Sequence, residues 1–195
     1  MRRVISAAWF FAAAFAFVMS CARPAAAESF TIDPVHSSVT FKAEHMGISW
    51  VHGRFNSFSG KFSVDKADPS KSSFELTIQA DSIDTGNAGR DNHLKGGDYF
   101  DAKQFATLSF KSTSVKPVKD GLEVKGDFTM HGQKKPITFV LKGGKEAEFP
   151  PGTKRIGYWT DLTIKRSDFG MVDKMPGALG DEIPVSVSFE GMGKK

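Results

Sequence analysis

The sequence predicts an all-β domain of about eight antiparallel strands behind a cleaved leader. Three observations lead to this prediction. Apolar and polar residues alternate with a period of two, turn residues separate the alternating runs, and no long helical pattern interrupts them. The length of 195 residues suits one domain. Hydrophobic residues at 40% and charged residues at 25% argue against wholesale disorder.

The N-terminus has the pattern of a secretory signal peptide. Met1–Arg3 is basic, Val4–Met19 is an almost unbroken apolar run, and small residues lead up to Ala27. We expect cleavage after Ala27, so that residues 1–27 are a signal peptide and residues 28–195 form an exported domain. The apolar run is shorter than the roughly 20 residues of a spanning helix. We therefore expect no stable membrane span after cleavage.

Removal of the leader changes the charge and the cysteine content. Three arginines and no acidic residue leave with it, so the net charge falls from +4 to +1. A nearly neutral domain lacks the basic surface that nucleic acids require, and no nucleic-acid partner is expected. Cys21 is the only cysteine, so the mature domain would have no disulfide. A minor alternative is lipoprotein anchoring at Cys21, because the residues before it loosely resemble a lipobox.

The alternating runs define the predicted strands. In Ser37–His45, for example, Val39, Phe41 and Ala43 share one face, and the polar residues between them share the other. In chain order, the eight predicted strands include Ser37–His45, Phe58–Val64, Phe74–Gln79, Leu108–Lys111, Gly121–Met130, Ile137–Leu141, Leu162–Lys165 and Val185–Glu190.

Turn residues and two irregular stretches separate these strands. Turns are predicted at Lys66–Ser70, Lys119–Gly121, His131–Pro136, Gly143–Gly144 and Pro150–Gly152. Alternation fails in His45–Asn56 and in Asn87–Phe105, and the second stretch suits a short helix and a loop. Both stretches are too apolar for plain solvent loops, so we expect them to cover an end of the sheet or the mouth of a barrel. Alternation alone leaves a sandwich and a closed barrel both open.

Several spaced motifs resemble those of the YceI-like family of secreted bacterial proteins, described as polyisoprenoid-binding. The resemblance runs from about Phe30 to Glu190. It is carried by Thr31–Phe41, His45–Asn56, Arg90–Leu94 with Tyr99–Asp101 and Phe105, Gly126–Gly132 and Lys165–Met171. The family's helical signature usually ends in Phe-Pro, where this chain has Phe105 and Ala106.

The resemblance implies a lipocalin-like, up-and-down antiparallel β-barrel around an apolar channel. Without it, the apolar stripe would be expected to fill a core. With it, the residues expected to line the channel are Val39, Phe41, Phe74, Leu76, Ile78, Leu108, Phe110, Phe128, Phe139, Leu162, Val187 and Phe189. The residues expected at its mouth are Trp50, Val51, Phe55, Leu94 and Phe100. Arg54, Arg90 and Arg166 are candidates for a head group, since guanidinium groups suit phosphate, although ordinary ion pairing would also explain them.

The polar residues do not form a convincing catalytic or metal site. Five histidines are spread over separate strands and loops without compact ligand spacing, so no metal site is predicted. Ser167, Asp168 and His131 lack the strand–turn–helix context of a hydrolase. Arg90, Asp91 and His93 could perform acid–base chemistry, but a network that fixes a loop explains them better. No cofactor and no enzymatic activity are expected.

The leading hypothesis is therefore a periplasmic protein that binds, transports or stores an isoprenoid lipid. A polyprenyl phosphate, an isoprenoid quinone or another long-chain apolar lipid would be the ligand. One alternative is an enzyme that acts on such a lipid. Another is a stress-related structural barrel without a small ligand. A homodimer through an apolar mouth also stays open.

Overall fold

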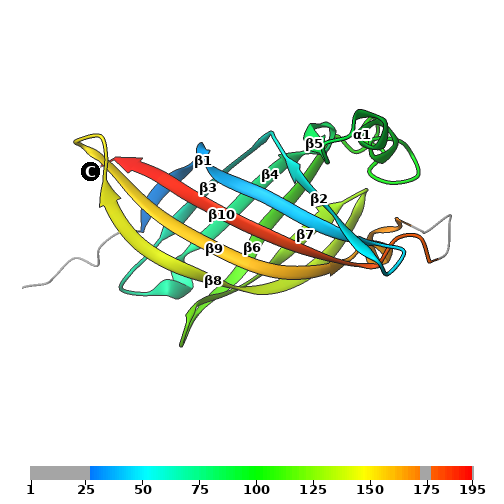
Figure 1. Cartoon of the computed structure of the whole chain (residues 1–195). Coiled ribbons are helices and arrows are strands. Elements are labelled where there is room, and N and C mark those ends of the chain that lie inside the picture. The colour runs from blue at the N-terminus through cyan, green and yellow to red at the C-terminus, as the bar shows by residue number, and fades with distance from the viewer. Residues whose placement is uncertain (1–26, 172–176, 195) are drawn as a thin grey trace, which may run out of the picture.

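The computed structural model describes residues 27–171 and 177–194, and the predicted signal peptide lies almost wholly outside these residues. The described chain forms a closed antiparallel β-barrel with one short helix (Figure 1). The strands are β1 (Glu28–His45), β2 (Ser49–Phe55), β3 (Phe58–Val64), β4 (Ser73–Gln79), β5 (Ile83–Asp84), β6 (Thr107–Val118), β7 (Gly121–Met130), β8 (Gln133–Glu148), β9 (Thr153–Lys165) and β10 (Glu182–Lys194). The helix is α1 (Ala88–Leu94), and the 3₁₀ turns are η1 (Pro69–Lys71), η2 (Ala80–Ser82) and η3 (Arg166–Phe169).

The ten strands occupy eight positions around the barrel, because two of these positions are each shared by two shorter strands. β2 and β3 pair with different parts of β1 and share one position. β5 pairs with β2, β4 pairs with β3, and these two strands share the next position. From β4 the order continues through β6, β7, β8, β9 and β10, and β10 pairs with β1 to close the ring. The predicted all-β, up-and-down barrel is thus confirmed. Closure removes the free sheet edges that a sandwich would keep.

A bulge in β1 changes which residues face the interior. The pairing of β1 with β10 shifts register between Asp33 and Ser38. Before the bulge the buried apolar residues are Phe30 and Ile32, and after it the inward row includes Val39. The extra residues reverse the phase of the alternation, as β-bulges do. For this reason the sequence pattern began only at Ser37, although the strand begins at Glu28.

Three local predictions were wrong. The turn predicted at His131–Pro136 is shorter than expected, because β8 begins at Gln133 and pairs with β7 from there. Residues within His45–Asn56 were expected to be irregular, but β2 forms a hairpin with β1 there, and Gly53 weakens the apolar alternation. Gly143–Gly144 was expected to be a turn, but both residues lie within β8 at a register shift against β9. Both glycines have positive φ values, which a bulge can use as readily as a turn.

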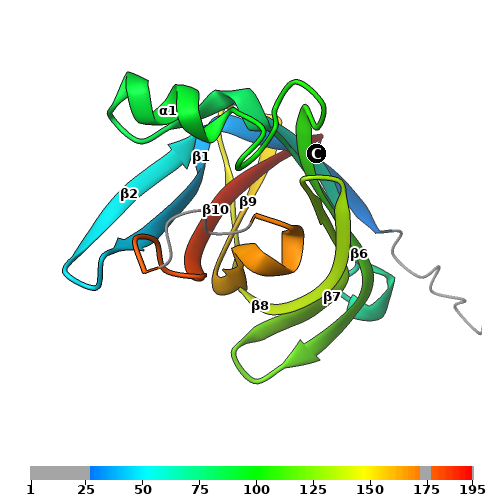
Figure 2. The same ribbon diagram turned by 90° about the vertical axis from the view of Figure 1, so that its right-hand side faces the viewer.

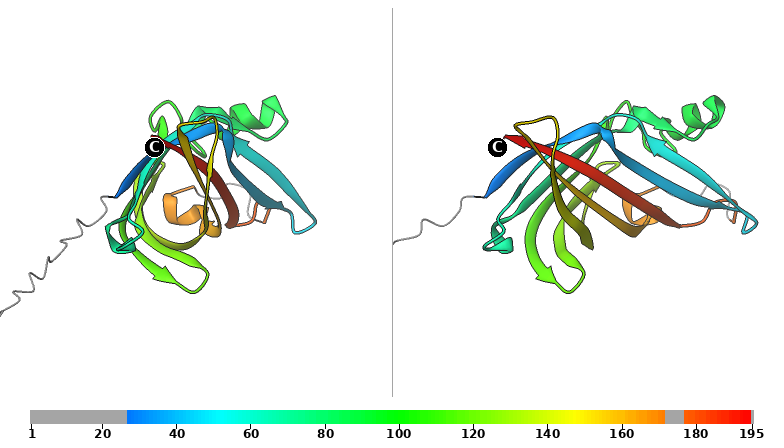
Figure 3. Two further views of the ribbon diagram at one scale, coloured as in Figure 1. Left: turned by 90° about the vertical axis from the view of Figure 1, so that its left-hand side faces the viewer. Right: turned by 60° about the vertical axis from the view of Figure 1, so that its left-hand side comes forward.

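The two ends of the barrel differ. The described N-terminus and the C-terminus lie at the same end (Figure 3). The dense aromatic core includes Phe30, Phe62 and Tyr158. At the other end, α1 crosses above the rim and η3 lies inside the opening (Figure 2). Asn87 caps the start of the helix, because its side chain accepts a hydrogen bond from the Arg90 backbone N–H. The helix lies within the stretch predicted to contain one.

Candidate functional site

A cavity of about 440 Å³ lies inside the barrel. This volume is within the range of small-molecule sites in proteins. Several inward side chains around it, such as Leu76, Phe128 and Leu162, remain half-exposed although they point into the barrel. The interior is therefore hollow here and is not filled by side chains.

The predicted channel residues surround this cavity. Every residue assigned to the channel lines it, and so do four of the five residues assigned to its mouth. These lining residues are Val39, Phe41, Val51, Phe55, Phe74, Leu76, Ile78, Leu94, Phe100, Leu108, Phe110, Phe128, Phe139, Leu162, Val187 and Phe189. The period-two pattern accounts for the twelve channel residues, whereas the four mouth residues come from the two stretches where alternation fails. The role of all sixteen in binding stays a prediction.

Trp50 and Arg54 are the exceptions, because both point away from the cavity. Val51 and Phe55 face inward, so their neighbours on β2 must face outward. Trp50 is 45% exposed, and the Lys42 ammonium lies 4.5 Å from its ring centroid. Arg54 is exposed opposite Asp84 of β5 and lines a separate hollow on the outer surface.

Glycines in the wall leave room for aromatic rings. A Cβ atom on Gly53 would lie 2.3 Å from Cζ of Phe41, its cross-strand partner. On β7, a Cβ atom on Gly126 would lie 2.5 Å from Cζ of Phe110. Both rings therefore pack against the wall at a position without a side chain. This packing places large apolar surfaces around the cavity while limiting how far they extend into it.

Arg90 is held at the mouth by a polar network. Its Nε donates to Thr85 Oγ1 at 2.7 Å, and its Nη2 donates to the Thr85 carbonyl at 2.8 Å. The Thr85 backbone N–H and hydroxyl in turn donate to Asp91 Oδ1. Nearby, the His93 and Tyr99 rings meet edge to face, and both line the cavity. The network fixes α1 above the opening, as one of the two sequence interpretations expected.

Arg166 lies at the same end but is buried, with 6% of its surface exposed. Its guanidinium donates to the backbone carbonyls of Met171, Leu179 and Gly180 at 2.8–3.1 Å. These contacts tie η3 to the start of β10. These charge-assisted hydrogen bonds stabilise a buried cation. Arg166 also lines the cavity, as Arg90 does, so a head-group role for either residue stays a prediction.

Other lining residues were not among the predicted site. Ile32, Phe62, Met130, Ile137 and Val185 also line the cavity. The alternation in Phe58–Val64 and Ile137–Leu141 would have identified some of them. Ile32 lies before the β1 bulge, where the phase differs from that of Val39, so no alternation signal connects the two.

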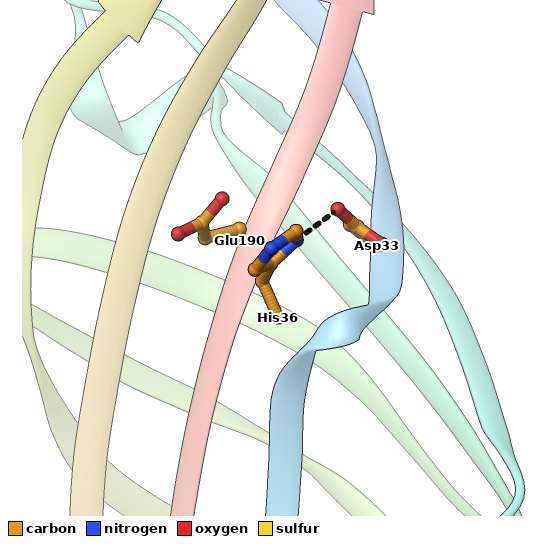
Figure 4. A group of neighbouring side chains, drawn as sticks. All are labelled: Asp33, His36 and Glu190. Carbon is orange, nitrogen blue, oxygen red and sulfur yellow. Dashed lines mark hydrogen bonds and ion pairs between the residues drawn. The ribbon is translucent and has the colours of Figure 1, made fainter. Parts of the chain in front are cut away.

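On the outer wall, three potential metal ligands lie close together: Asp33, His36 and Glu190 (Figure 4). The sequence spacing gave no sign of this group. Arg155 already bridges the two carboxylates, since its Nη1 donates to Asp33 at 2.7 Å and to Glu190 at 2.9 Å. The His36 ring bonds to Asp33 at 2.8 Å. We interpret the group as an ion-pair network that fixes the β1 bulge against β9 and β10.

The hydrogen bonds with His36 and from Arg155 lower the pKa of Asp33 to about 2. Both partners favour the ionised carboxylate, although burial of the side chain opposes this. The network is therefore held together by a buried negative charge.

Within residues 27–171 and 177–194, no helix has both the length and the apolar character needed to cross a bilayer.

Comparison with known proteins gives a consistent result. The family model described as "YceI-like domain" matches residues 30–191. A protein named YceI from Escherichia coli is 35% identical over 183 residues, covering 93% of this chain and 95% of that protein.

Two solved structures share the architecture. A Campylobacter jejuni YCEI protein superposes with a TM-score of 0.68 at 29% identity, covering 78% of this chain and 90% of that chain. A polyisoprenoid binding domain from Saccharophagus degradans superposes with a TM-score of 0.61 at 17% identity, covering 86% of this chain and 99% of that chain. The similarity to the polyisoprenoid binding domain shows a shared fold alone.

Proposed function

Because the chain belongs to the YceI-like domain family, we propose that it binds an isoprenoid lipid inside its barrel, without catalysis. The observation that carries the proposal is the cavity of about 440 Å³, whose lining side chains are mainly aliphatic and aromatic. The polyisoprenoid binding domain from Saccharophagus degradans gives a precedent for such a ligand in the same architecture.

The energetics of the cavity favour a hydrocarbon guest. Each methylene group removed from water contributes about 0.8 kcal/mol, less the cost of ordering the chain. Burial of this kind discriminates weakly between similar tails. We therefore expect a lipid that is recognised chiefly by its apolar tail, such as a polyprenyl phosphate or an isoprenoid quinone.

We further propose that the protein performs this role in the periplasm, after removal of residues 1–27. A carrier that shields an apolar tail from water is useful between two membranes. The basic start, the apolar run and the small residues before Glu28 support export.

Native mass spectrometry of the protein purified from its own periplasm tests the proposal. We expect an apolar lipid that remains bound and can be extracted with organic solvent. Val187→Trp should remove it, because Val187 lines the cavity in mid-strand. Ser188→Trp is the matched control, since its exposed side chain points outward on the same strand. A folded wild-type protein that never carries or takes up an apolar lipid would contradict the proposal.

A further inference from the structure

The cavity ends abruptly, although the inward-facing rows of side chains continue beyond it. On β9 the inward row is Ile156, Tyr158, Thr160, Leu162 and Ile164, and only the last three line the cavity. Ile156 and Tyr158 are 2% and 5% exposed, so they form solid core. The alternation is the same in both parts, but one part is hollow and the other is filled.

The neighbouring strands show the same boundary. On β1, Ile32 lines the cavity and Phe30 does not. On β7, Phe128 lines it, whereas Val124 is fully buried beyond it. The boundary between cavity and solid core is therefore found on β1, β7 and β9.

Three phenylalanines close it, and we call Phe62, Phe74 and Phe189 the aromatic floor. All three line the cavity and are at least nine-tenths buried. The Phe62 ring stacks on Phe74 at 5.6 Å and meets Phe189 edge to face at 5.3 Å, between ring centroids.

The floor is supported from beneath and from the side. Phe30 stacks on the far side of the floor, 5.2 Å from the Phe62 ring centroid. A Cβ atom on Gly191 would lie 2.2 Å from Cζ of Phe62, so this glycine makes room for the ring. A ligand tail could pass the floor only by displacing close-packed aromatic rings, and such interiors resist displacement.

The size of the hollow sets how much tail fits above the floor. The lining residues on β10 run from Ile183 to Phe189, a span of about 20 Å along the tilted strand at about 3.3 Å per residue. An apolar cavity of about 150 Å³ holds one benzene ring, so the cavity here holds roughly three rings' worth of carbon, or fewer than about twenty carbon atoms.

We propose that the aromatic floor limits the bound segment to about three or four isoprene units. This inference rests on the proposed function and deepens it. A longer tail binds through the part that enters the barrel, and the remainder stays outside the mouth beside α1. Affinity for a prenyl lipid therefore rises with tail length only up to this limit.

A length series of prenols tests the limit on the delipidated mature protein. Geraniol, farnesol, geranylgeraniol and nonaprenol contain two, three, four and nine isoprene units, and their affinities can be measured by displacement of a bound apolar dye. From geraniol to geranylgeraniol we expect affinity to rise by at least about tenfold per unit that is fully buried. From geranylgeraniol to nonaprenol we expect a change of less than about threefold, since no further methylene is buried.

Substitutions in the aromatic floor should change the limit on tail length. Phe62→Ala opens the floor, and nonaprenol should then bind at least about tenfold more tightly than geranylgeraniol. Phe74→Leu removes less side-chain volume, and it replaces Phe62→Ala in the same measurement if Phe62→Ala does not fold. Ile156→Ala is the control, because it creates space beyond the floor without opening it, and it should leave the length dependence unchanged.

The outcomes separate the inference from the function on which it rests. Wild-type affinity that keeps rising to nonaprenol would overturn the length limit and leave the proposed function standing. Folded floor variants with an unchanged length dependence would also overturn the limit. Failure of every prenol to bind would overturn both.

Discussion

The Phe41 ring packs against Gly53, its partner on the facing strand of the β1–β2 hairpin. A Cβ atom at Gly53 would lie only 2.3 Å from Phe41 Cζ. Since Gly53 faces inward, any side chain there would push the ring toward the centre of the barrel. The missing side chain of Gly53 therefore helps to keep the cavity open.

Gly53→Val is expected to reduce ligand affinity by more than about tenfold, because a displaced Phe41 ring takes the volume of several methylene groups. Displacement of a bound dye by geranylgeraniol measures this loss. Gly157→Ala is a matched control on β9, where no atom lies within 4 Å of the added Cβ. A folded Gly53→Val protein with wild-type affinity would show that Phe41 does not control the volume.

Replacing Arg166 should affect folding more than ligand choice. Arg166→Met leaves three backbone carbonyls without their donor, so the free energy of unfolding should fall by about 3 kcal/mol or more. Arg90→Met is expected to cost less than about 1 kcal/mol, because Arg90 is exposed. Urea unfolding of both variants checks the difference. Unchanged stability of Arg166→Met, with weaker binding of a prenyl phosphate than of the prenol, would instead assign Arg166 to the head group.

The Asp33 network predicts a specific loss of stability in acid. Its folded-state pKa of about 2 lies below the ordinary value of 3.8, so the ionised carboxylate stabilises the fold. That contribution is complete above about pH 5 and is lost as the pH falls through about 2, and it amounts to about 2 kcal/mol.

The measurement is the free energy of unfolding of wild type and Asp33→Asn between pH 6 and pH 2. The two curves should converge as the pH falls, because protonation of Asp33 removes from the wild type the same negative charge that the substitution removes from the variant. Asp120→Asn, in the exposed turn between β6 and β7, is the control and should follow the wild type. A constant difference between wild type and Asp33→Asn would contradict the assigned pKa.

Alternation was enough to place most of the inner wall. Phe74, Leu76 and Ile78 alternate without interruption, and all three face the cavity as predicted. Alternation shows which way a side chain points, however, and not whether the space that it faces is filled. Ile156 and Leu162 lie in one inward row, yet one is solid core and the other lines a hollow. Whether a barrel is filled depends on how side chains from several strands pack together, which no single strand reveals.

Other features depend on contacts that are distant in sequence. The register shift after Asp33 depends on the pairing of β1 with β10 and hides Ile32 from the pattern. The burial of Arg166 depends on carbonyls at positions 171, 179 and 180, which have no side-chain signature. Backbone acceptors of this kind can be supplied by any residue, so the sequence shows the cation but not its partners.

The neighbours Trp50 and Val51 allow a direct test of which face of β2 meets the ligand. Trp50→Ala should change affinity by less than about twofold, because the Trp50 side chain points away from the cavity and contacts Lys42 on the outer surface. Val51→Trp should weaken binding by more than about tenfold, since the larger side chain fills space at the mouth that the ligand needs. Val51 is only half-buried, so its enlargement should leave the core intact. Titration with geranylgeraniol measures both effects. Equal effects of the two substitutions, or a larger loss for Trp50→Ala, would mean that the ligand contacts the outer surface of the barrel and not its interior.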